Sequence, residues 1–258
     1  TLKKKVDEGG KVTMLTSYDY TMAALTEQAG IDMILVADSL GMTMMGYDST
    51  LPVTMDDMVH HTRCVTRACN NTFVVGDMPF GSYQADPYDG VQAAVRMIKE
   101  TGADALKLEG GEEFADVIRR IINAGIPVMG HLGLMPQSIH KYGTYGVRAK
   151  DDSEAEKLVR DAHLLEEAGC FALVLEKIPA ALAARVAGEL SIPVIGIGAG
   201  NGVDGQVLVV TDMLGMNDGF SPKFLRRYAD LHSVMTEAIS RYVHDVKTKD
   251  FPNEKEQY

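Results

Sequence analysis

The sequence has 258 residues, of which 46% are hydrophobic and 24% are charged, and these proportions are ordinary for a globular protein with a large core. Its net charge of −11 argues against a nucleic-acid backbone or an anionic membrane surface as a partner. No apolar run reaches the roughly 18 residues that span a bilayer, and the first residues, TLKKKVDEGG, predict no secretion signal. The three cysteines have no zinc-site spacing, so we expect reduced thiols and a cytoplasmic protein.

Eight short apolar segments alternate with helical segments along the chain. The predicted strands are Val12–Thr16, Met33–Ala37, Phe73–Gly76, Ala105–Leu108, Pro127–Gly130, Phe171–Leu175, Pro193–Ile197 and Gln206–Thr211. Asp86-Pro87 predicts one helix start, and Ser153 with Glu156 predicts a capping box at another. The predicted helices end at a residue that favours a left-handed backbone, namely Gly30, Gly102, Gly125 and Gly169. This alternation predicts a parallel sheet covered by helices.

Eight parallel strands in a chain of this length predict a (β/α)₈ TIM barrel, with residues 1–258 forming a single domain. An open, doubly wound sheet is the alternative. The link GAGNGVDG before the last strand is too short for a crossover helix and predicts a single helical turn or a loop. An amphipathic helix from Ser221-Pro222 through Val246, followed by a charged tail, is expected at the end. GIGAGNG does not match G-x-G-x-x-G, which disfavours a dinucleotide site and favours a tight turn.

Ionisable residues follow at least six of the eight predicted strands. They are Asp38 after the second, Asp77 after the third, Lys107 and Glu109 in and after the fourth, His131 after the fifth, Glu176 after the sixth and Asp212 after the eighth. The carboxyl ends of the strands form the active-site face of a parallel barrel. One such acid carries little information, but six strand ends together predict a site.

Each residue also has a purely structural interpretation. Asp38 could cap a turn, and Glu109 could belong to a solvated run before the next helix. His131 could be a core histidine with satisfied hydrogen bonds. Glu176 is harder to explain in this way, because apolar residues precede it and a carboxylate so close to a core needs a partner or a raised pKa. We assign structural roles to Asp19, Glu112, Glu113 and Asp212.

Carboxylates without clustered cysteine or histidine favour a hard cation, with Mg²⁺ first. Such an ion could chelate a 2-oxo acid and act as a Lewis acid that stabilises an enolate. Lys107 and His131 could contact the same oxygens, and Glu176 is the natural base for the α-proton.

Several long motifs occur in order: VADSLGMTMMGYDSTLPVTMDDMVHHT, GDMPFGSY, KLEGGEE, GHLGLMPQS, VLEKIP and IPVIGIGAGNGVDGQVLV. From about Met14 to Val210 the chain closely resembles the ketopantoate hydroxymethyltransferases. The resemblance implies a barrel of the phosphoenolpyruvate/pyruvate-binding type in a homo-oligomer, often a decamer. It also implies one-carbon transfer from 5,10-methylenetetrahydrofolate to 3-methyl-2-oxobutanoate, giving 2-dehydropantoate for pantothenate synthesis.

The resemblance also implies roles for individual residues. By similarity, Mg²⁺ is bound by Asp38, Asp77 and Glu109, and the oxo acid by Asp38, Ser39, Asp77, Lys107 and His131. Glu176 matches the proton acceptor. The stretch HKYGTYGVRAKDD, residues 140–152, departs from the family's V-Q-G-R/K-G ending on the side where we expect the folate.

Two other classes of function remain open at this stage. One is a carbon–carbon lyase or mutase that acts on another 2-oxo acid or carboxylate, which a folate-dependence assay separates from the transferase. The other is a catalytically silent ligand-binding or scaffold barrel, for which a Mg²⁺-dependence assay is decisive.

Overall fold

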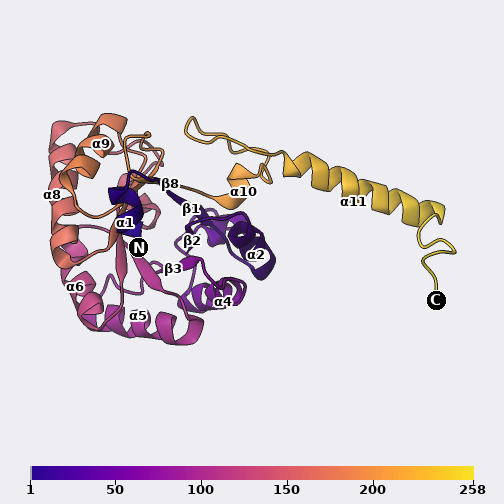
Figure 1. Ribbon diagram of the computed structural model, residues 1–258, viewed down its shortest axis with the longest axis horizontal. Helices are drawn as coiled ribbons and strands as arrows, with labels where there is room; N and C mark the ends of the chain where they lie inside the picture. Colours follow the sequence, from indigo (N-terminus) through magenta and orange to yellow (C-terminus); the bar gives the residue numbers. More distant parts are fainter. Residues whose placement is uncertain (1) are drawn as a thin grey trace. The chain divides into compact units, whose positions relative to one another are not determined.

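The computed structural model describes residues 2–258 and contains a closed barrel of eight parallel strands in sequential order (Figure 1). Each strand pairs with the next, and β1 pairs with β8, Val12 lying opposite Gly205. The strands are β1 Val12–Thr16, β2 Met33–Val36, β3 Phe73–Asp77, β4 Ala105–Glu109, β5 Val128–Gly133, β6 Ala172–Glu176, β7 Val194–Ile197 and β8 Gly205–Leu208. The predicted TIM barrel is therefore confirmed, and the alternative of an open sheet is wrong.

All eight predicted strands are present, and most of the differences lie at their ends. β5 extends farther than predicted, to Gly133. β8 ends at Leu208, earlier than predicted, because the chain turns into the short helix α10, Val210–Met213. Asp212 consequently lies in a helix and not at a strand end. The link between β7 and β8 is a loop without a helix, as its length predicts.

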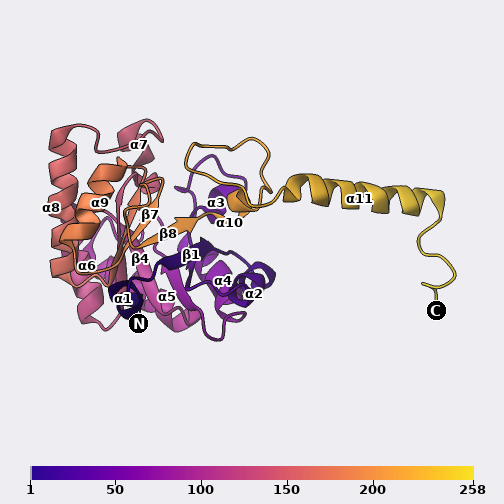
Figure 2. The same ribbon diagram turned by 45° about the horizontal axis from the view of Figure 1, so that its top comes forward.

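Helices cover the outside of the barrel (Figure 1). Those in the part of the chain up to β8 are α1 Leu2–Asp7, α2 Tyr20–Gln28, α3 Leu40–Thr43, α4 Met55–Thr66, α5 Pro87–Thr101, η1 Glu112–Phe114, α6 Ala115–Asn123, η2 Pro136–Ser138, α7 Ile139–Tyr142, α8 Asp152–Ala168 and α9 Ala180–Glu189. Figure 2 shows α1 at the opposite end of the barrel from α7. α7 comes shortly after the carboxyl end of β5, and α1 comes shortly before the amino end of β1. The two helices therefore mark the carboxyl and amino ends of the barrel.

Helix ends follow local sequence signals in most cases. Asp86 caps α5 by accepting a hydrogen bond from the Tyr88 N–H, and Gly102 ends the helix at φ 73°. α8 is an exception to the prediction. Its N-cap is Asp151, which accepts from the Glu154 N–H, so the predicted capping box at Ser153 is wrong.

The core of the barrel is apolar. β2 is buried along its whole length, and so is β4, including its two charged residues. Each large apolar side chain that is fully buried, such as Ile34 or Leu108, contributes about 1.5–3 kcal/mol. Because the strands are packed in this core, the positions of the side chains at their carboxyl ends are fixed as well.

The contacts divide the chain into two compact units, one ending at Val209 and the other comprising Val210–Tyr258. The second unit contains α10 and α11, Leu231–Thr248. α11 begins at Leu231 because Asp230 caps it by accepting from the Ser233 N–H, so the predicted start at Ser221-Pro222 is wrong. The assignment of residues 1–258 to a single domain stays a prediction. Among residues 2–258, none of the helices has the length and apolar composition needed to cross a membrane.

Candidate active site

The carboxyl ends of strands β2 to β6 bring together the ionisable residues that the sequence singles out. Parallel register aligns Asp77 with Lys107, and Glu109 with His131. Asp38 follows β2, and Glu176 ends β6. Five of the six residues are at most 3% exposed, namely Asp38, Asp77, Lys107, Glu109 and His131. Charged side chains are almost never buried to this degree unless they are paired, so the cluster must satisfy itself or a ligand.

The buried residues form a continuous set of contacts. Lys107 Nζ lies 2.9 Å from Asp77 Oδ1 and 3.3 Å from His131 Nδ1. His131 Nδ1 lies 3.5 Å from Glu109 Oε1, and its Nε2 lies 3.4 Å from Glu176 Oε2. The Asp38 N–H donates to Asp77 Oδ2 at 3.2 Å. The imidazole of His131 therefore connects Glu109 to Glu176.

Burial and mutual repulsion shift the titration of these groups. Desolvation, together with the charges of Asp77 and Glu109, raises the pKa of Asp38 well above its usual range. Desolvation also raises the pKa of Asp77, although the Lys107 ammonium opposes the shift. Desolvation and Lys107 alone would lower the pKa of His131, but the neighbouring carboxylates of Glu109 and Glu176 outweigh them and raise it to about 9. Desolvation also lowers the pKa of Lys107, but its acidic neighbours outweigh this effect and raise it.

The site fits a divalent cation held by oxygen ligands. Four carboxylates face only two cationic side chains, so the cluster has an excess of negative charge. Two of its buried atoms, Asp77 Oδ1 and His131 Nε2, have ion-pair contacts but no hydrogen-bond partner. Within residues 2–258, no three His, Cys, Asp or Glu side chains are arranged as a ready-made ligand set. Mg²⁺ usually binds one or two protein carboxylates and completes its coordination with water and substrate oxygens.

Ser39 lies at the edge of the same cluster. It is half-buried, and its Oγ is 2.8 Å from the Tyr18 hydroxyl. It directly precedes α3, beside Asp38. This position is compatible with the substrate contact that the resemblance implies.

Two buried residues that the sequence analysis did not assign, Tyr83 and Gln137, hydrogen-bond to the acids or to their backbone. The Tyr83 hydroxyl accepts from the Glu109 N–H at 3.0 Å, and the Gln137 side chain donates to Asp38 Oδ2 at 2.9 Å. Both residues lie in the motifs quoted above, GDMPFGSY and GHLGLMPQS. The only signal in the sequence was that each is a polar residue shortly after a strand end. Their hydrogen-bond partners lie far away in the sequence, so this signal did not identify them.

The segment 140–152 contacts Lys177, the residue that follows Glu176 at the end of β6. The Arg148 N–H donates to the Lys177 carbonyl at 2.8 Å, and Lys177 Nζ donates to the Tyr145 carbonyl. The Arg148 guanidinium lies 4.0 Å from the centre of the Tyr142 ring. Lys177 takes a left-handed φ of 45°, a conformation that costs a non-glycine residue about 1–2 kcal/mol. The segment that departs from the family pattern is therefore attached next to Glu176.

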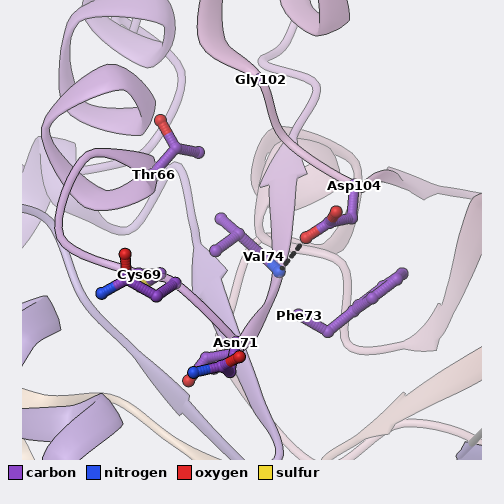
Figure 3. Close-up of a pocket in the computed structure, with 9 residues that line it drawn as sticks. Thr66, Cys69, Asn71, Phe73, Val74, Gly102 and Asp104 are labelled. Carbon is purple, nitrogen blue, oxygen red and sulfur yellow. Dashed lines mark hydrogen bonds between the residues drawn. The ribbon is translucent and has the colours of Figure 1, made fainter.

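A separate cavity of about 220 Å³ lies at the amino end of β3 (Figure 3). Thr66, Cys69, Phe73 and Asp104 are among its lining residues, and Asp104 accepts a hydrogen bond from the Val74 N–H at 2.8 Å. Burial, with the charges of Glu27 and Asp104, raises the pKa of Cys69 to about 11. The thiol is therefore protonated at neutral pH and a poor nucleophile. The acid cluster at the opposite strand ends remains the candidate active site.

Comparison with known proteins gives one consistent family. The family model for ketopantoate hydroxymethyltransferase matches residues 1–254. The 3-methyl-2-oxobutanoate hydroxymethyltransferase of Bacteroides fragilis (strain ATCC 25285) is 70% identical over 250 residues, covering 97% of this chain and 92% of that protein. The enzyme of the same name from Flavobacterium johnsoniae is 60% identical over the same shares of both chains.

Solved structures share the fold at much lower identity. Phosphonopyruvate hydrolase in complex with oxalate and Mg²⁺ superposes with a TM-score of 0.62 at 14% identity, covering 99% of this chain and 91% of that chain. The 2,3-dimethylmalate lyase, a member of the PEP mutase/isocitrate lyase superfamily, gives a TM-score of 0.62 at 15% identity, with coverage of 100% and 90%. At this identity the likeness concerns the barrel alone.

Proposed function

Because the chain belongs to the ketopantoate hydroxymethyltransferase family, we propose that it transfers a hydroxymethyl group to 3-methyl-2-oxobutanoate, forming 2-dehydropantoate in pantothenate biosynthesis. The one-carbon donor in this proposal is 5,10-methylenetetrahydrofolate. The observation that carries the proposal is the buried cluster in which His131 connects Glu109 to Glu176. Such a cluster can bind a charged oxo acid at one side and remove a proton at the other.

We assign the binding of Mg²⁺ to Asp38, Asp77 and Glu109. When bound, the ion would act as a Lewis acid toward the oxo acid and stabilise the negative charge that develops on its ketone oxygen. Lys107 and His131 support the same assignment, because cationic donors in a site without bulk water stabilise developing oxyanions strongly. We assign Ser39 to substrate contact, next to Asp38.

We assign the role of base to Glu176. Its side chain is 18% exposed, whereas those of Asp77 and Glu109 are 1% and 4% exposed, so Glu176 is the acid most open to a bound substrate. In this role its carboxylate takes the proton from C3 of the oxo acid, and the electron pair of the C–H bond becomes available for the new carbon–carbon bond. The attachment of segment 140–152 beside Glu176 supports a folate position on this side of the barrel.

A variant of the base tests the proposal. Glu176→Gln should abolish the exchange of the C3 proton of 3-methyl-2-oxobutanoate with deuterium oxide, because the amide cannot accept the proton, while Mg²⁺ binding and the melting temperature persist. Glu167→Gln, the same change at an exposed position of α8, is the matched control and should exchange normally. Unchanged exchange in Glu176→Gln would rule out this base. Product formation without folate would instead point to a lyase or mutase.

We also propose that the protein is a cytoplasmic homo-oligomer, and a decamer by family resemblance. α11 supports assembly, because it has no buried residue and presents an apolar stripe formed by Val234, Met235, Ile239, Tyr242, Val243 and Val246. Large apolar surfaces of this kind usually mark an interface. The three cysteines are free thiols, which fits a reducing compartment. Light scattering at assay concentration tests the assembly, and a monomeric mass would contradict it.

A further inference from the structure

Gln137 occupies an unusual place beside the acid cluster. It lies in η2, just beyond β5, and is 6% exposed. A buried neutral amide must find hydrogen-bond partners for two donors and two acceptor sites, and an unmatched one is destabilising. The identity of its partners therefore indicates what the residue does.

All four positions of the Gln137 amide are used. Nε2 donates to Asp38 Oδ2 and to the Met78 carbonyl, both at 2.9 Å. Oε1 accepts from the Tyr83 hydroxyl and from Gln84 Nε2, both at 2.9 Å. Only acceptors face the nitrogen and donors face the oxygen, so the amide can adopt one orientation alone. One of its two N–H groups is thereby directed at Asp38 and the other at the Met78 carbonyl.

The backbone of the same residue reaches a second acid. The Gln137 N–H donates to Glu109 Oε2 at 3.0 Å. One residue thus occupies one oxygen of Asp38 and one oxygen of Glu109. Asp38 Oδ1 has no hydrogen bond from any residue in the described part of the chain, and Glu109 Oε1 has only the 3.5 Å contact with His131.

We propose that Gln137 is a positioning residue for the cation: it holds Asp38 and Glu109 so that the second oxygen of each is directed at the metal. This inference rests on the metal site assigned above. A neutral amide suits the task, because a cationic donor at this position would compete with the ion for the carboxylates. Residues that orient metal ligands in this way commonly account for about 10- to 100-fold in metal affinity.

A purely structural role predicts a different result. In that case Gln137 would only connect the loop after β5 to Met78 and Tyr83 in the loop after β3. Its removal would then lower stability but leave the metal affinity of the folded protein unchanged. Affinity and stability must therefore be measured separately.

The experiment compares Gln137→Met with Gln92→Met. Methionine matches glutamine in length but has no amide, and Gln92 is exposed on α5, so the control has the same chemical change without the contacts. Mn²⁺ binding to the substrate-free protein is titrated by electron paramagnetic resonance, and melting temperatures are recorded alongside. We expect the Mn²⁺ Kd of Gln137→Met to rise about 10- to 100-fold, that of Gln92→Met to stay within about twofold, and saturating Mg²⁺ to restore most C3 exchange.

Two outcomes would overturn the inference, and they can be distinguished. If the unaltered protein binds Mn²⁺ and the Mn²⁺ Kd of folded Gln137→Met lies within about twofold of its value, Gln137 does not position the ligands. If the unaltered protein binds no Mn²⁺, the proposed metal site fails, and this inference fails with it. Should Gln137→Met not fold, Gln84→Met removes the amide that donates to Oε1 and leaves the hydrogen bonds that Asp38 and Glu109 make with Gln137 and Tyr83 in place. It should weaken Mn²⁺ binding about three- to tenfold, and an unchanged Kd would again refute the proposal.

Discussion

Substitution of Gly133 tests how closely β5 packs against the backbone of Glu176, the proposed base. It ends β5 at φ +93°, directly opposite Glu176 in the register of β5 and β6. A Cβ added here would lie 2.3 Å from the Glu176 carbonyl oxygen and 2.8 Å from Ile178 Cγ2. That carbonyl accepts a hydrogen bond from the Leu134 N–H at 2.8 Å, so it cannot move away freely. Gly133→Ala should therefore distort the strand that carries Glu176.

Two effects of this substitution can be estimated separately. Left-handed φ costs an alanine about 1–2 kcal/mol, and overpacking against a fixed neighbour costs about 1–3 kcal/mol more. Gly133→Ala should lower the free energy of unfolding by roughly 2–5 kcal/mol. Gly30→Ala is the matched control, because Gly30 has a similar φ of +83° and nothing within 4 Å of the added Cβ. It should lower the free energy of unfolding by only about 1–2 kcal/mol.

Thermal unfolding and C3 deuterium exchange together provide the assay. At about 2–4 °C per kcal/mol for a chain of this size, Gly133→Ala should melt roughly 2–12 °C below Gly30→Ala. Below both melting temperatures its exchange rate should fall about 10- to 100-fold, because displacement of a catalytic group by up to 1 Å has effects of this order. Equal melting temperatures for the two variants would refute the close packing of Gly133 against the Glu176 carbonyl. Normal exchange in Gly133→Ala would refute the claim that this packing holds the Glu176 side chain in place.

Two further predictions concern charged groups. Hydrogen bonds from the Asn71 and Thr72 N–H groups lower the pKa of Glu27 to about 2, from 4.5; this carboxylate therefore stabilises the fold above pH 4.5 and loses that effect as the pH falls toward 2. Glu27→Gln should accordingly melt below the unaltered protein at pH 7, and a gap that persists undiminished near pH 2 would contradict this origin. Lys107→Met leaves the buried Asp77 without its ammonium partner and should lower the free energy of unfolding by about 3–5 kcal/mol. Added Mg²⁺ should raise the melting temperature of this variant more than that of the unaltered protein, and an equal rise would count against metal binding at Asp77.

The strands could be predicted from the sequence because each is a short, mostly apolar run, and most of these runs end in or are followed by a polar residue. Burial on both faces makes such runs continuous, as in Met33–Val36, and the glycines that end α2, α5, α6 and α8 come shortly before the next strand. Helix starts were less predictable when several candidate caps were adjacent. Asp151 and Ser153 can both cap α8, and only the structure shows that Asp151 does. The start of α11 was misplaced because Ser221-Pro222 has the form of a helix start, whereas the helix begins nine residues later, after Asp230.

The acids of the candidate site were predictable for a topological reason. In a parallel barrel every strand ends at the same face, so a residue's position along its own strand already determines that it meets the others. Gln137 and Tyr83 had no such signal. Gln137 lies in η2 and Tyr83 in the loop after β3, and their contacts span 99 residues between Gln137 and Asp38 and 26 between Tyr83 and Glu109. Contacts over such separations depend on the path of the loop, which no local pattern in the sequence specifies.

The charge of the cluster connects the stability of the barrel to its proposed ligand. Asp38, Asp77 and Glu109 lie in the low-dielectric interior, where desolvation and the repulsion among them raise the pKa values of both aspartates. Folding brings these acids together, and a bound dication relieves their repulsion only in the folded state. Metal binding at the proposed site would therefore be coupled to folding, and each tenfold increase in free Mg²⁺ above its Kd should add about 1.4 kcal/mol to the free energy of unfolding. Lys107, His131 and Gln137 already offset part of this repulsion, because each of them pairs with or donates to one of the acids.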